Sequence, residues 1–268
     1  MKNWLITLLK GGFVGSTMLV PGVSGGSMAM IIGIYDKLIN AVSSFTKDIK
    51  KNILFLLVFA GGAGVGAVIF ANPILSLIER FPKPMLYFFI GAVAGGIPLM
   101  IKQSTVKKFS WKLPLYIVLG GAIVISISFI PTGGIDVGGG IAHYLLLLFA
   151  GFISAVALVL PGISVSYMFL VLGIYEQFMD SVSTLYLPFL VPLGVGLIIG
   201  IFMTTKILDT AMKKYPVPVY FIILGFLLGS VFEIFPGLPL LKEIPICVIA
   251  FLAGFAVFFF VSRKEADQ

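Results

Sequence analysis

The chain alternates long apolar stretches with short polar segments, and the apolar stretches are too long for a soluble domain. Three long ranges contain no Asp, Glu, Lys or Arg: 11–35, 52–78 and 137–175. A bilayer core about 30 Å thick is crossed by about 20 apolar helical residues, so most such ranges can span a membrane. Further charge-free ranges lie at 84–101, 113–135, 186–205, 215–232 and 244–262.

Two blocks of sequence occur twice in the same order. PGVSGGSMAMIIGIYDKLINAVS at 21–43 aligns without gaps with PGISVSYMFLVLGIYEQFMDSVS at 161–183. FPKPMLYFFIGAVAG at 81–95 aligns with YPVPVYFIILGFLLG at 215–229. Collinear matches of this kind indicate an internal repeat, and they divide the chain into a first repeat, 1–135, and a second repeat, 136–268.

Each repeat is predicted to hold one helical hairpin, broken at Pro-Gly-(Val/Ile)-Ser, followed by three transmembrane helices. Proline and its neighbouring glycine interrupt helical hydrogen bonding, which a membrane tolerates only where protein or a cavity covers the backbone. The predicted fold class is therefore all-α integral membrane, with inverted repeats and re-entrant or broken hairpins. The hairpins are expected at 5–43 and 145–183, and the spans at 53–78, 84–101, 113–130, 188–206, 217–232 and 245–262.

The number of crossings predicts that the two repeats have opposite orientations. A hairpin adds zero or two crossings and the spans add three, so each repeat crosses an odd number of times. With this topology only Arg80, Lys83 and Lys242 fall on the outer face, and the other 15 of the 18 Lys and Arg residues (18 − 3) are cytoplasmic. The bias follows the positive-inside rule and places both termini in the cytoplasm.

Composition excludes several classes of protein. Charged residues make up 11% of the chain, hydrophobic residues 59%, and the mean hydropathy is +1.14, which no ordinary soluble domain matches. A single cysteine, Cys247, and a single histidine, His143, argue against a disulfide framework or a metal or haem cofactor. The net charge of +7 lies in predicted cytoplasmic loops facing anionic lipids, so no nucleic-acid partner is expected.

The two hairpin tips are the first candidate site. A helix that restarts after a break presents free backbone N–H groups and the positive end of its dipole, which favours a phosphate or carboxylate. Paired interruptions in two inverted halves are the sequence pattern of a transporter site, although glycine and proline also form simple packing kinks in membrane helices. The candidate phosphate-binding residues are Pro21, Gly22, Ser24, Gly25, Gly26, Ser27, Pro161, Gly162, Ser164 and Ser166.

Acidic and basic residues at the ends of the spans are the second group of candidates. Asp36 and Glu176 follow the repeated Gly-Ile-Tyr, and with Glu79 they could couple transport to protons or cations, or simply be solvated at the interface. Arg80 could clamp a phosphate arriving from outside, or could be a cation that snorkels at a helix end.

An enzyme is the weaker interpretation. Gly22-Val23-Ser24-Gly25 has the Gly-x-Ser-Gly pattern of intramembrane serine proteases, which need a base on a neighbouring helix. The only histidine, His143, is expected near the outer end of the second hairpin, whereas Ser24 enters from the inner face. A lipid phosphatase would usually need more than one histidine. No catalytic residue is therefore assigned.

The two Pro-Gly-(Val/Ile)-Ser blocks with their trailing Gly-Ile-Tyr-(Asp/Glu) resemble the signature of PopT-type undecaprenyl-phosphate translocases, domain-of-unknown-function family 368. The resemblance extends over nearly the whole chain. It implies a flippase of the bacterial plasma membrane that returns the polyprenyl-phosphate lipid from the outer to the cytoplasmic leaflet during cell-wall synthesis, and it is compatible with a homodimer. The residues alone also allow a transporter of a small soluble anion, or a membrane scaffold that transports nothing.

Overall fold

The computed structural model describes residues 2–18, 23–108, 110–130 and 140–266, and its regular elements in these ranges are all helical. This confirms the all-α membrane class. A short 3-10 turn at Phe45–Lys47 precedes the fourth α-helix. The α-helices are α1 (Lys2–Thr17), α2 (Gly25–Ile31), α3 (Tyr35–Ser43), α4 (Ile49–Arg80), α5 (Pro82–Gln103), α6 (Lys112–Ser128), α7 (Ile141–Val159), α8 (Val165–Val171), α9 (Tyr175–Thr184), α10 (Leu187–Lys214), α11 (Pro216–Ile234) and α12 (Ile244–Ala266).

The order of helices repeats along the chain. A helix, a seven-residue helix and a short helix are followed by three longer ones in α1–α6, and the same order recurs in α7–α12. The matched prolines of the second repeated block have the same role in both places, because Pro82 begins α5 and Pro216 begins α11. Proline suits the first turn of a helix, where its missing N–H would have no partner.

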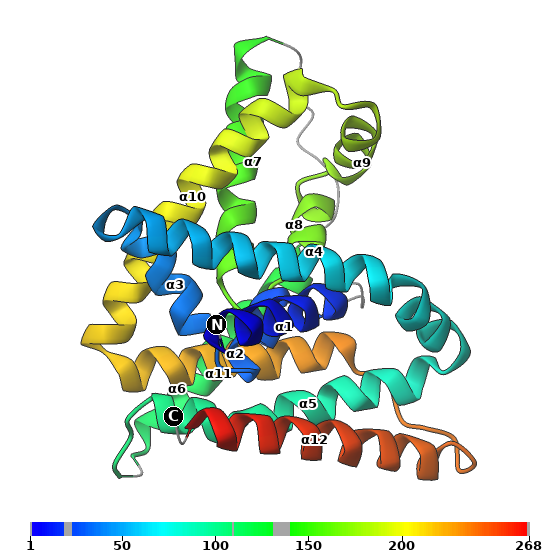
Figure 1. Ribbon diagram of the computed structural model, residues 1–268. Coiled ribbons are helices and arrows are strands. Elements are labelled where there is room, and N and C mark those ends of the chain that lie inside the picture. The colour runs from blue at the N-terminus through cyan, green and yellow to red at the C-terminus, as the bar shows by residue number, and fades with distance from the viewer. Residues whose placement is uncertain (1, 19–22, 109, 131–139, 267–268) are drawn as a thin grey trace.

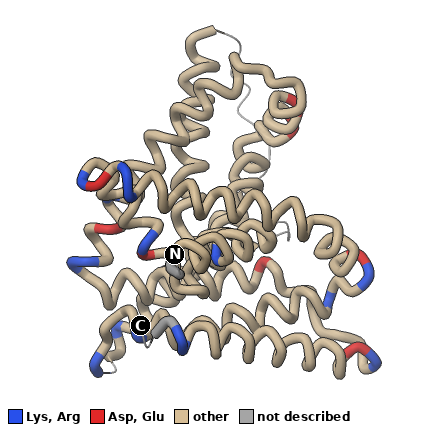
Figure 2. Tube along the Cα trace, viewed as in Figure 1, with Lys and Arg blue, Asp and Glu red and all other residues tan. Residues whose placement is uncertain are grey.

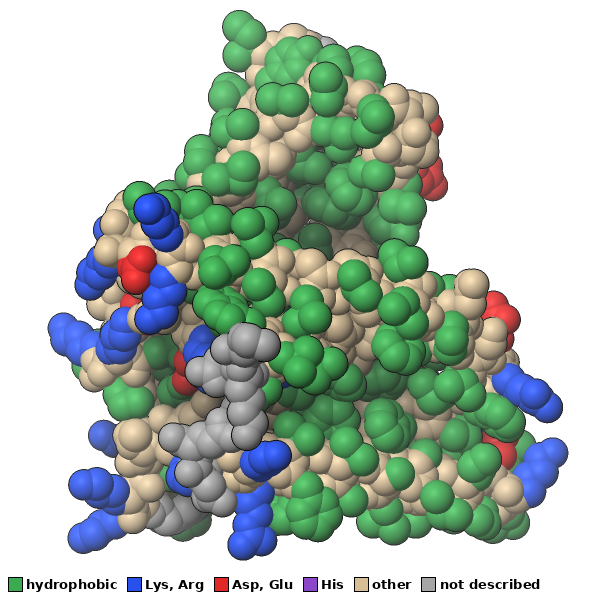
Figure 3. All heavy atoms as spheres, viewed as in Figure 1, with side chains coloured by type: hydrophobic (Ala, Val, Ile, Leu, Met, Phe, Trp, Pro, Cys, Tyr) green, Lys and Arg blue, Asp and Glu red, His purple; other side chains and the backbone are tan. Residues whose placement is uncertain are grey.

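Six helices are long and apolar enough to cross a bilayer, judged by length and composition: α4, α5, α7, α10, α11 and α12. The apolar helix α6 is shorter, at 17 residues. Of the 32 residues of α4 only Gly62 and Gly66 are buried, and Val68 is 80% exposed. Figure 3 shows apolar side chains over most of the visible face, as expected where lipid replaces water.

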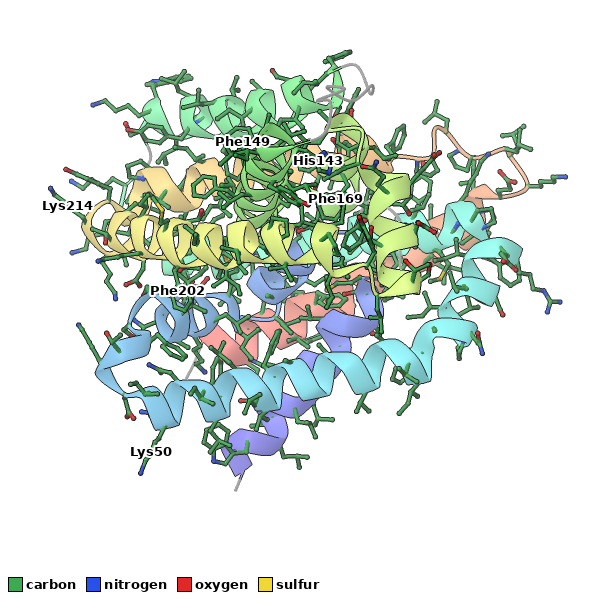
Figure 4. The ribbon with its side chains drawn as sticks, turned by 90° about the horizontal axis from the view of Figure 1, so that it is seen from above. Lys50, His143, Phe149, Phe169, Phe202 and Lys214 are labelled. Carbon is green, nitrogen blue, oxygen red and sulfur yellow. The ribbon has the colours of Figure 1, made fainter. Side chains whose placement is uncertain are left out.

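The long helices run in opposite directions in the two halves. In Figure 4 Lys50, at the start of α4, and Lys214, at the end of α10, both lie toward the left, so α4 begins at the side where α10 ends. In Figure 1 α5 and α11 likewise run in opposite senses. The halves also exchange partners: α1 packs on α4 and α7 on α10 within each half, whereas α5 packs on α12 and α6 on α11 between halves.

Basic residues gather at one end of the molecule, which we call the basic side (Figure 2). It holds the start of α4 and the C-terminal ends of α5, α10 and α12, and the N and C labels in Figure 1 both lie toward it. The opposite side holds the junction of α4 and α5 and the loop before α12, with Arg80, Lys83 and Lys242. This division of charge is the one expected for a multi-pass membrane protein.

Glycines allow all four main helix pairs to approach closely. A methyl group added to Gly62 of α4 would overlap the carbonyl oxygen of Leu8 in α1, and one on Gly196 of α10 would overlap that of Leu148 in α7. Because lipid tails are as apolar as the side chains, membrane helices associate through such close van der Waals packing rather than through hydrophobic burial. The corresponding glycines of the exchanged pairs are Gly91 and Gly254 for α5 and α12, and Gly120 and Gly225 for α6 and α11.

We predict that Gly62→Ala lowers stability by about 1–3 kcal/mol, because the added methyl must push α1 away from α4. The neighbouring glycine provides a matched control: Gly61 is exposed, and a methyl there meets no atom within 4 Å. Gly61→Ala should leave the melting temperature unchanged or raise it slightly, since alanine is the better helix former. Thermal unfolding of the detergent-solubilised variants measures both, and equal melting temperatures would contradict the packing argument.

Candidate functional site

The tips of the two hairpins meet inside the molecule. The backbone N–H of Gly162 donates a hydrogen bond of 2.8 Å to Oγ of Ser27, a residue 135 positions away. A second link lies beside it, where the hydroxyl of Tyr35 donates to the carbonyl oxygen of Val159 at 2.6 Å. Both bonds are buried, and Pro161 is almost fully enclosed. The structure therefore brings Ser27, Pro161 and Gly162 together, with Gly26 against the backbone of Pro161.

The first tip enters α2 through Ser24, whose side chain forms no capping hydrogen bond. Ser24, Gly25 and Gly26 are half-buried, and the side chain of Met18 lies against Gly25. The predicted site residues Pro21 and Gly22 lie outside the described residues. Because α2 has only seven residues, an anion there would depend on individual N–H and hydroxyl groups more than on a full helix dipole.

The second tip has a different local structure. Gly162 adopts a φ of +88°, and Ser164 caps α8 by accepting a 3.4 Å hydrogen bond from the backbone N–H of Tyr167. A narrow crevice beside this tip is lined by Gly162, Ser164, Tyr167 and Glu233, among others. The hydroxyl of Ser128 donates to Glu233 at its rim. Ser166, by contrast, is exposed.

Each hairpin contains a second break that the sequence analysis did not predict. Gly33 and Gly173 have φ values of +69° and +68°, and they end α2 and α8. In both hairpins the residue after the glycine donates to the carbonyl five positions back: Ile34 to Ala29 and Ile174 to Phe169, each at 3.0 Å. This is the Schellman motif, in which glycine accepts the left-handed conformation. The repeated Gly-Ile-Tyr is thus the stop signal of the short helix.

The two acids after this motif occupy unlike surroundings. Asp36 is partly buried, and one of its oxygens accepts a 2.6 Å hydrogen bond from the hydroxyl of Tyr220 in α11. Its other oxygen is buried and has no hydrogen-bond partner among the described residues. Glu176 is exposed. Tyr220 belongs to no recognised functional motif. Apart from its place in the repeated YPVPVY segment, nothing in the sequence indicates that it contacts Asp36.

Asp36 and Tyr220 border a cavity of about 970 Å³ at the basic side. Side chains of α1, α3, α4, α10 and α11, together with the end of α5, line it. Basic side chains surround a hollow at the left of Figure 3, the side on which this cavity lies. Sequence analysis did not predict the cavity, because its walls come from helices far apart along the chain.

Glu79 and Arg80 lie at the exposed end of α4, apart from the hairpin tips (Figure 1). The guanidinium of Arg80 lies 5.6 Å from the ring centroid of Phe81. Nearby, Lys83 forms a 3.0 Å ion pair with Glu243, which also accepts from the backbone N–H of Leu240. These two hydrogen bonds, the Leu240 one first, lower the pKa of Glu243 below its ordinary value. The structure does not join Arg80 to Ser27 or Gly162.

His143 lies in the first turn of α7, sixteen residues before Val159, which corresponds to about 24 Å along the helix. Its ring lies 6.0 Å from that of Tyr144, measured between the ring centroids, and Figure 4 shows His143 on α7. It therefore cannot act as a base for Ser24 or Ser27. Within the described ranges no three His, Cys, Asp or Glu side chains gather in a way that could hold a metal ion.

A model of the VCA0040-like family, described as undecaprenyl phosphate translocase-like, matches residues 14–247. The chain belongs to this family. A relative from Staphylococcus aureus named polyprenyl-phosphate transporter is 31% identical over 276 aligned residues, which cover 98% of each protein. Another of the same name from Vibrio cholerae serotype O1 is 29% identical over 248 residues, covering 87% of this chain and 78% of the relative. No solved structure matches the chain.

Family membership agrees with the resemblance seen in the repeated blocks. The matched range contains both hairpin tips, the Asp36–Tyr220 pair and most of the helices that line the cavity. The match also begins after the first residues of α1 and ends inside α12, so it covers both halves of the repeat. A polytopic membrane transporter is the class that these observations support.

We predict that Gly162→Ala strongly destabilises the second tip. Alanine would be held in a left-handed backbone conformation, which costs about 1–2 kcal/mol of stability. Its methyl group would also lie 2.5 Å from the carbonyl oxygen of Phe226, and this overlap costs about 1–3 kcal/mol more. Gly237 has a similar φ of +77° but open space around it, so Gly237→Ala isolates the conformational part. Thermal unfolding should show the larger loss for Gly162→Ala; equal losses would mean that contact with α11 is unimportant.

Proposed function

We propose that this chain is a polyprenyl-phosphate transporter that returns undecaprenyl phosphate from the outer to the cytoplasmic leaflet of the bacterial plasma membrane, for reuse in cell-wall synthesis. The observation that carries the proposal is the direct meeting of the two broken hairpins, Ser27 with Gly162, inside an otherwise apolar helical protein. The names of the relatives and of the family support the substrate. The leaflet direction comes from the resemblance.

The proposed architecture is two inverted repeats, 1–135 and 136–268, with both termini in the cytoplasm. Three observations support it: the repeated order of helices, the opposite directions of α4 and α10, and the exchange of partners between halves. The gathering of lysines at one side supports its assignment as cytoplasmic. In such transporters the site lies where the repeats meet, and access alternates as one repeat moves against the other.

The phosphate head would bind at the junction of the tips, against the hydroxyl of Ser24, which makes no capping hydrogen bond, and against the half-buried backbone of Gly25 and Gly26. Glycines allow an anion to approach backbone N–H groups closely. Ser164, beside the crevice of the second tip, would complete the site. Support is weaker for Ser166 and Arg80, which are exposed, so we propose no direct contact for them. The isoprenoid tail would remain in lipid along the apolar exterior.

The bond between Ser27 and Gly162 would define one of the alternating states. It occupies the N–H group of Gly162, so the phosphate cannot use that group while the tips are joined. Separation of the tips would release both groups at once and open a polar route between the repeats. The relatives are named transporters, and the proposal accordingly assigns no catalytic residue. A homodimer remains a prediction of the sequence.

We predict that Ser27→Ala reduces transport by about tenfold, because the link between the tips loses its acceptor, a contact worth about 1 kcal/mol or more when a buried N–H is left unpaired. Proteoliposomes containing a fluorescent short-chain polyprenyl phosphate, with a membrane-impermeant quencher outside, measure the transfer between leaflets. Ser183→Ala is the matched control, since that exposed hydroxyl bonds only to the local backbone of α9. No dependence on the wild-type protein would overturn the function, and strong competition by inorganic phosphate would favour a soluble anion.

We predict that Asp36→Asn abolishes any response of transport to an imposed proton gradient. The side-chain amide of asparagine keeps an oxygen that can accept the hydrogen bond from Tyr220. Unlike a carboxylate, however, the amide cannot take up and release a proton during transport. Its counterpart in the second repeat supplies the control, because Glu176 is exposed and Glu176→Gln should keep the wild-type response. The measurement is the transport rate with the vesicle lumen acidified or alkalinised by one pH unit. An unchanged response in Asp36→Asn would exclude this carboxylate as the coupling group.

A further inference from the structure

The cavity at the basic side has the size of a ligand site. Its volume is about 970 Å³, near the upper end of the roughly 300–1,000 Å³ typical of small-molecule sites. A phosphate ion alone would leave most of such a space empty. The cavity therefore has room for a phosphate group together with the first part of a lipid chain.

The lining of the cavity is divided between apolar and cationic side chains. Trp4, Phe55 and Met212 provide apolar walls, and further apolar residues of α1 and α3 join them. The charged residues are four lysines and two acids, a net excess of two positive charges (4 − 2). An amphiphilic anion fits such a surface better than a small hydrated anion does. Its charged group can bind near the lysines while its apolar part packs against the apolar side chains. The charged residues are Lys10, Lys37, Lys51 and Lys213, with Asp36 and Asp209.

Two of these lysines are available to a ligand. Lys213 forms a 2.7 Å ion pair with Asp209 in the next turn of α10. The ammonium groups of Lys37 and Lys51 form no ion pair with any residue in the described ranges, although they line the same cavity. They come from α3 and α4, so a phosphate between them would join the first hairpin to the first long helix. Lysine binds phosphate as a compact point charge.

Helix α3 of the first hairpin lines part of the cavity. Asp36 and Tyr220 line it, and Tyr35, the residue next to Asp36, bonds to Val159 beside the second tip. When ionised, the carboxylate of Asp36 would oppose the binding of an anion in the cavity. The wall of the cavity that carries Asp36 and Lys37 thus belongs to the hairpin that is bonded to the second tip.

We infer that this cavity is a second substrate site, which holds the phosphomonoester head and the first isoprene units of polyprenyl phosphate at the cytoplasmic side after the head leaves the hairpin tips. The inference rests on the proposed function for the identity of the lipid. It assigns Lys37 and Lys51 to the phosphate, the apolar wall with Trp4 to the chain, and Asp36 to the boundary between the two sites. Weak, reversible binding of the lipid in this cavity would favour its release into the cytoplasmic leaflet.

Trp4 makes the inference directly testable, because the chain has only two tryptophans and the other, Trp111, is 86% exposed and is not among the residues that line the cavity. In a Trp111→Phe background, the fluorescence of Trp4 should change on titration with farnesyl phosphate. Farnesol and inorganic phosphate should each bind at least tenfold more weakly, since each lacks half of the recognised chemistry. Equal binding of inorganic phosphate, or of farnesol, would overturn the assignment to a prenyl phosphomonoester, as would the absence of any Trp4 response.

Charge variants test the site itself. Lys37→Gln with Lys51→Gln should weaken farnesyl phosphate binding by about tenfold or more, and Asp36→Asn should strengthen it several-fold. Lys107→Gln with Lys108→Gln removes the same charge from exposed positions that do not line the cavity, and should leave the affinity unchanged. Equal losses in both double variants, or no loss in the first, would overturn the site. Transport measured separately with the wild-type protein tests the proposed function, so the two can fail independently.

Discussion

Close backbone contact between helix pairs is the constraint on which the rest of this structure depends. In lipid, apolar side chains gain little by leaving their surroundings, so helices must associate through tight packing and polar contacts. Glycines at the crossings of α1 with α4 and of α7 with α10 let carbonyl groups approach the facing helix directly. The exchanged pairs α5 with α12 and α6 with α11 use the same device, and they tie one half of the chain to the other.

These rigid pairs hold the short helices of the hairpins in place. Neither α2 nor α8, at seven residues each, would be stable alone. Five of the seven residues of α2 are buried, which makes it part of the core rather than a loop at the surface. A broken backbone is tolerated there because protein covers it, and the bond between Ser27 and Gly162 satisfies one of the groups that the break exposes.

The two halves share an architecture but differ in chemistry. The side chain of Ser24 makes no capping hydrogen bond to α2, whereas Ser164 caps its own helix. Asp36 is enclosed with Tyr220 beside a large cavity, while Glu176 faces outward. Such asymmetry suits a carrier that meets different conditions on its two sides. For Asp36, it also provides a matched residue in the other half, Glu176, as a natural control.

Much of this protein was determined by sequence alone: the helical membrane class, the repeated blocks, the family, and the two motifs whose residues meet at the centre. Apolar length and the spacing of Pro-Gly-x-Ser are local properties, so they can be recognised without coordinates. The stop signal at Gly33 and Gly173 was visible in the sequence but was interpreted as part of an interface, because its left-handed geometry depends on the helix before it. Only the tertiary structure decided that Ser27 bonds to Gly162, that Asp36 meets Tyr220, and that lysines from four helices border one cavity. These contacts join residues more than a hundred positions apart, or helices whose relative placement is set by glycine packing, and the pattern along a single helix does not encode which face of a distant helix it will meet.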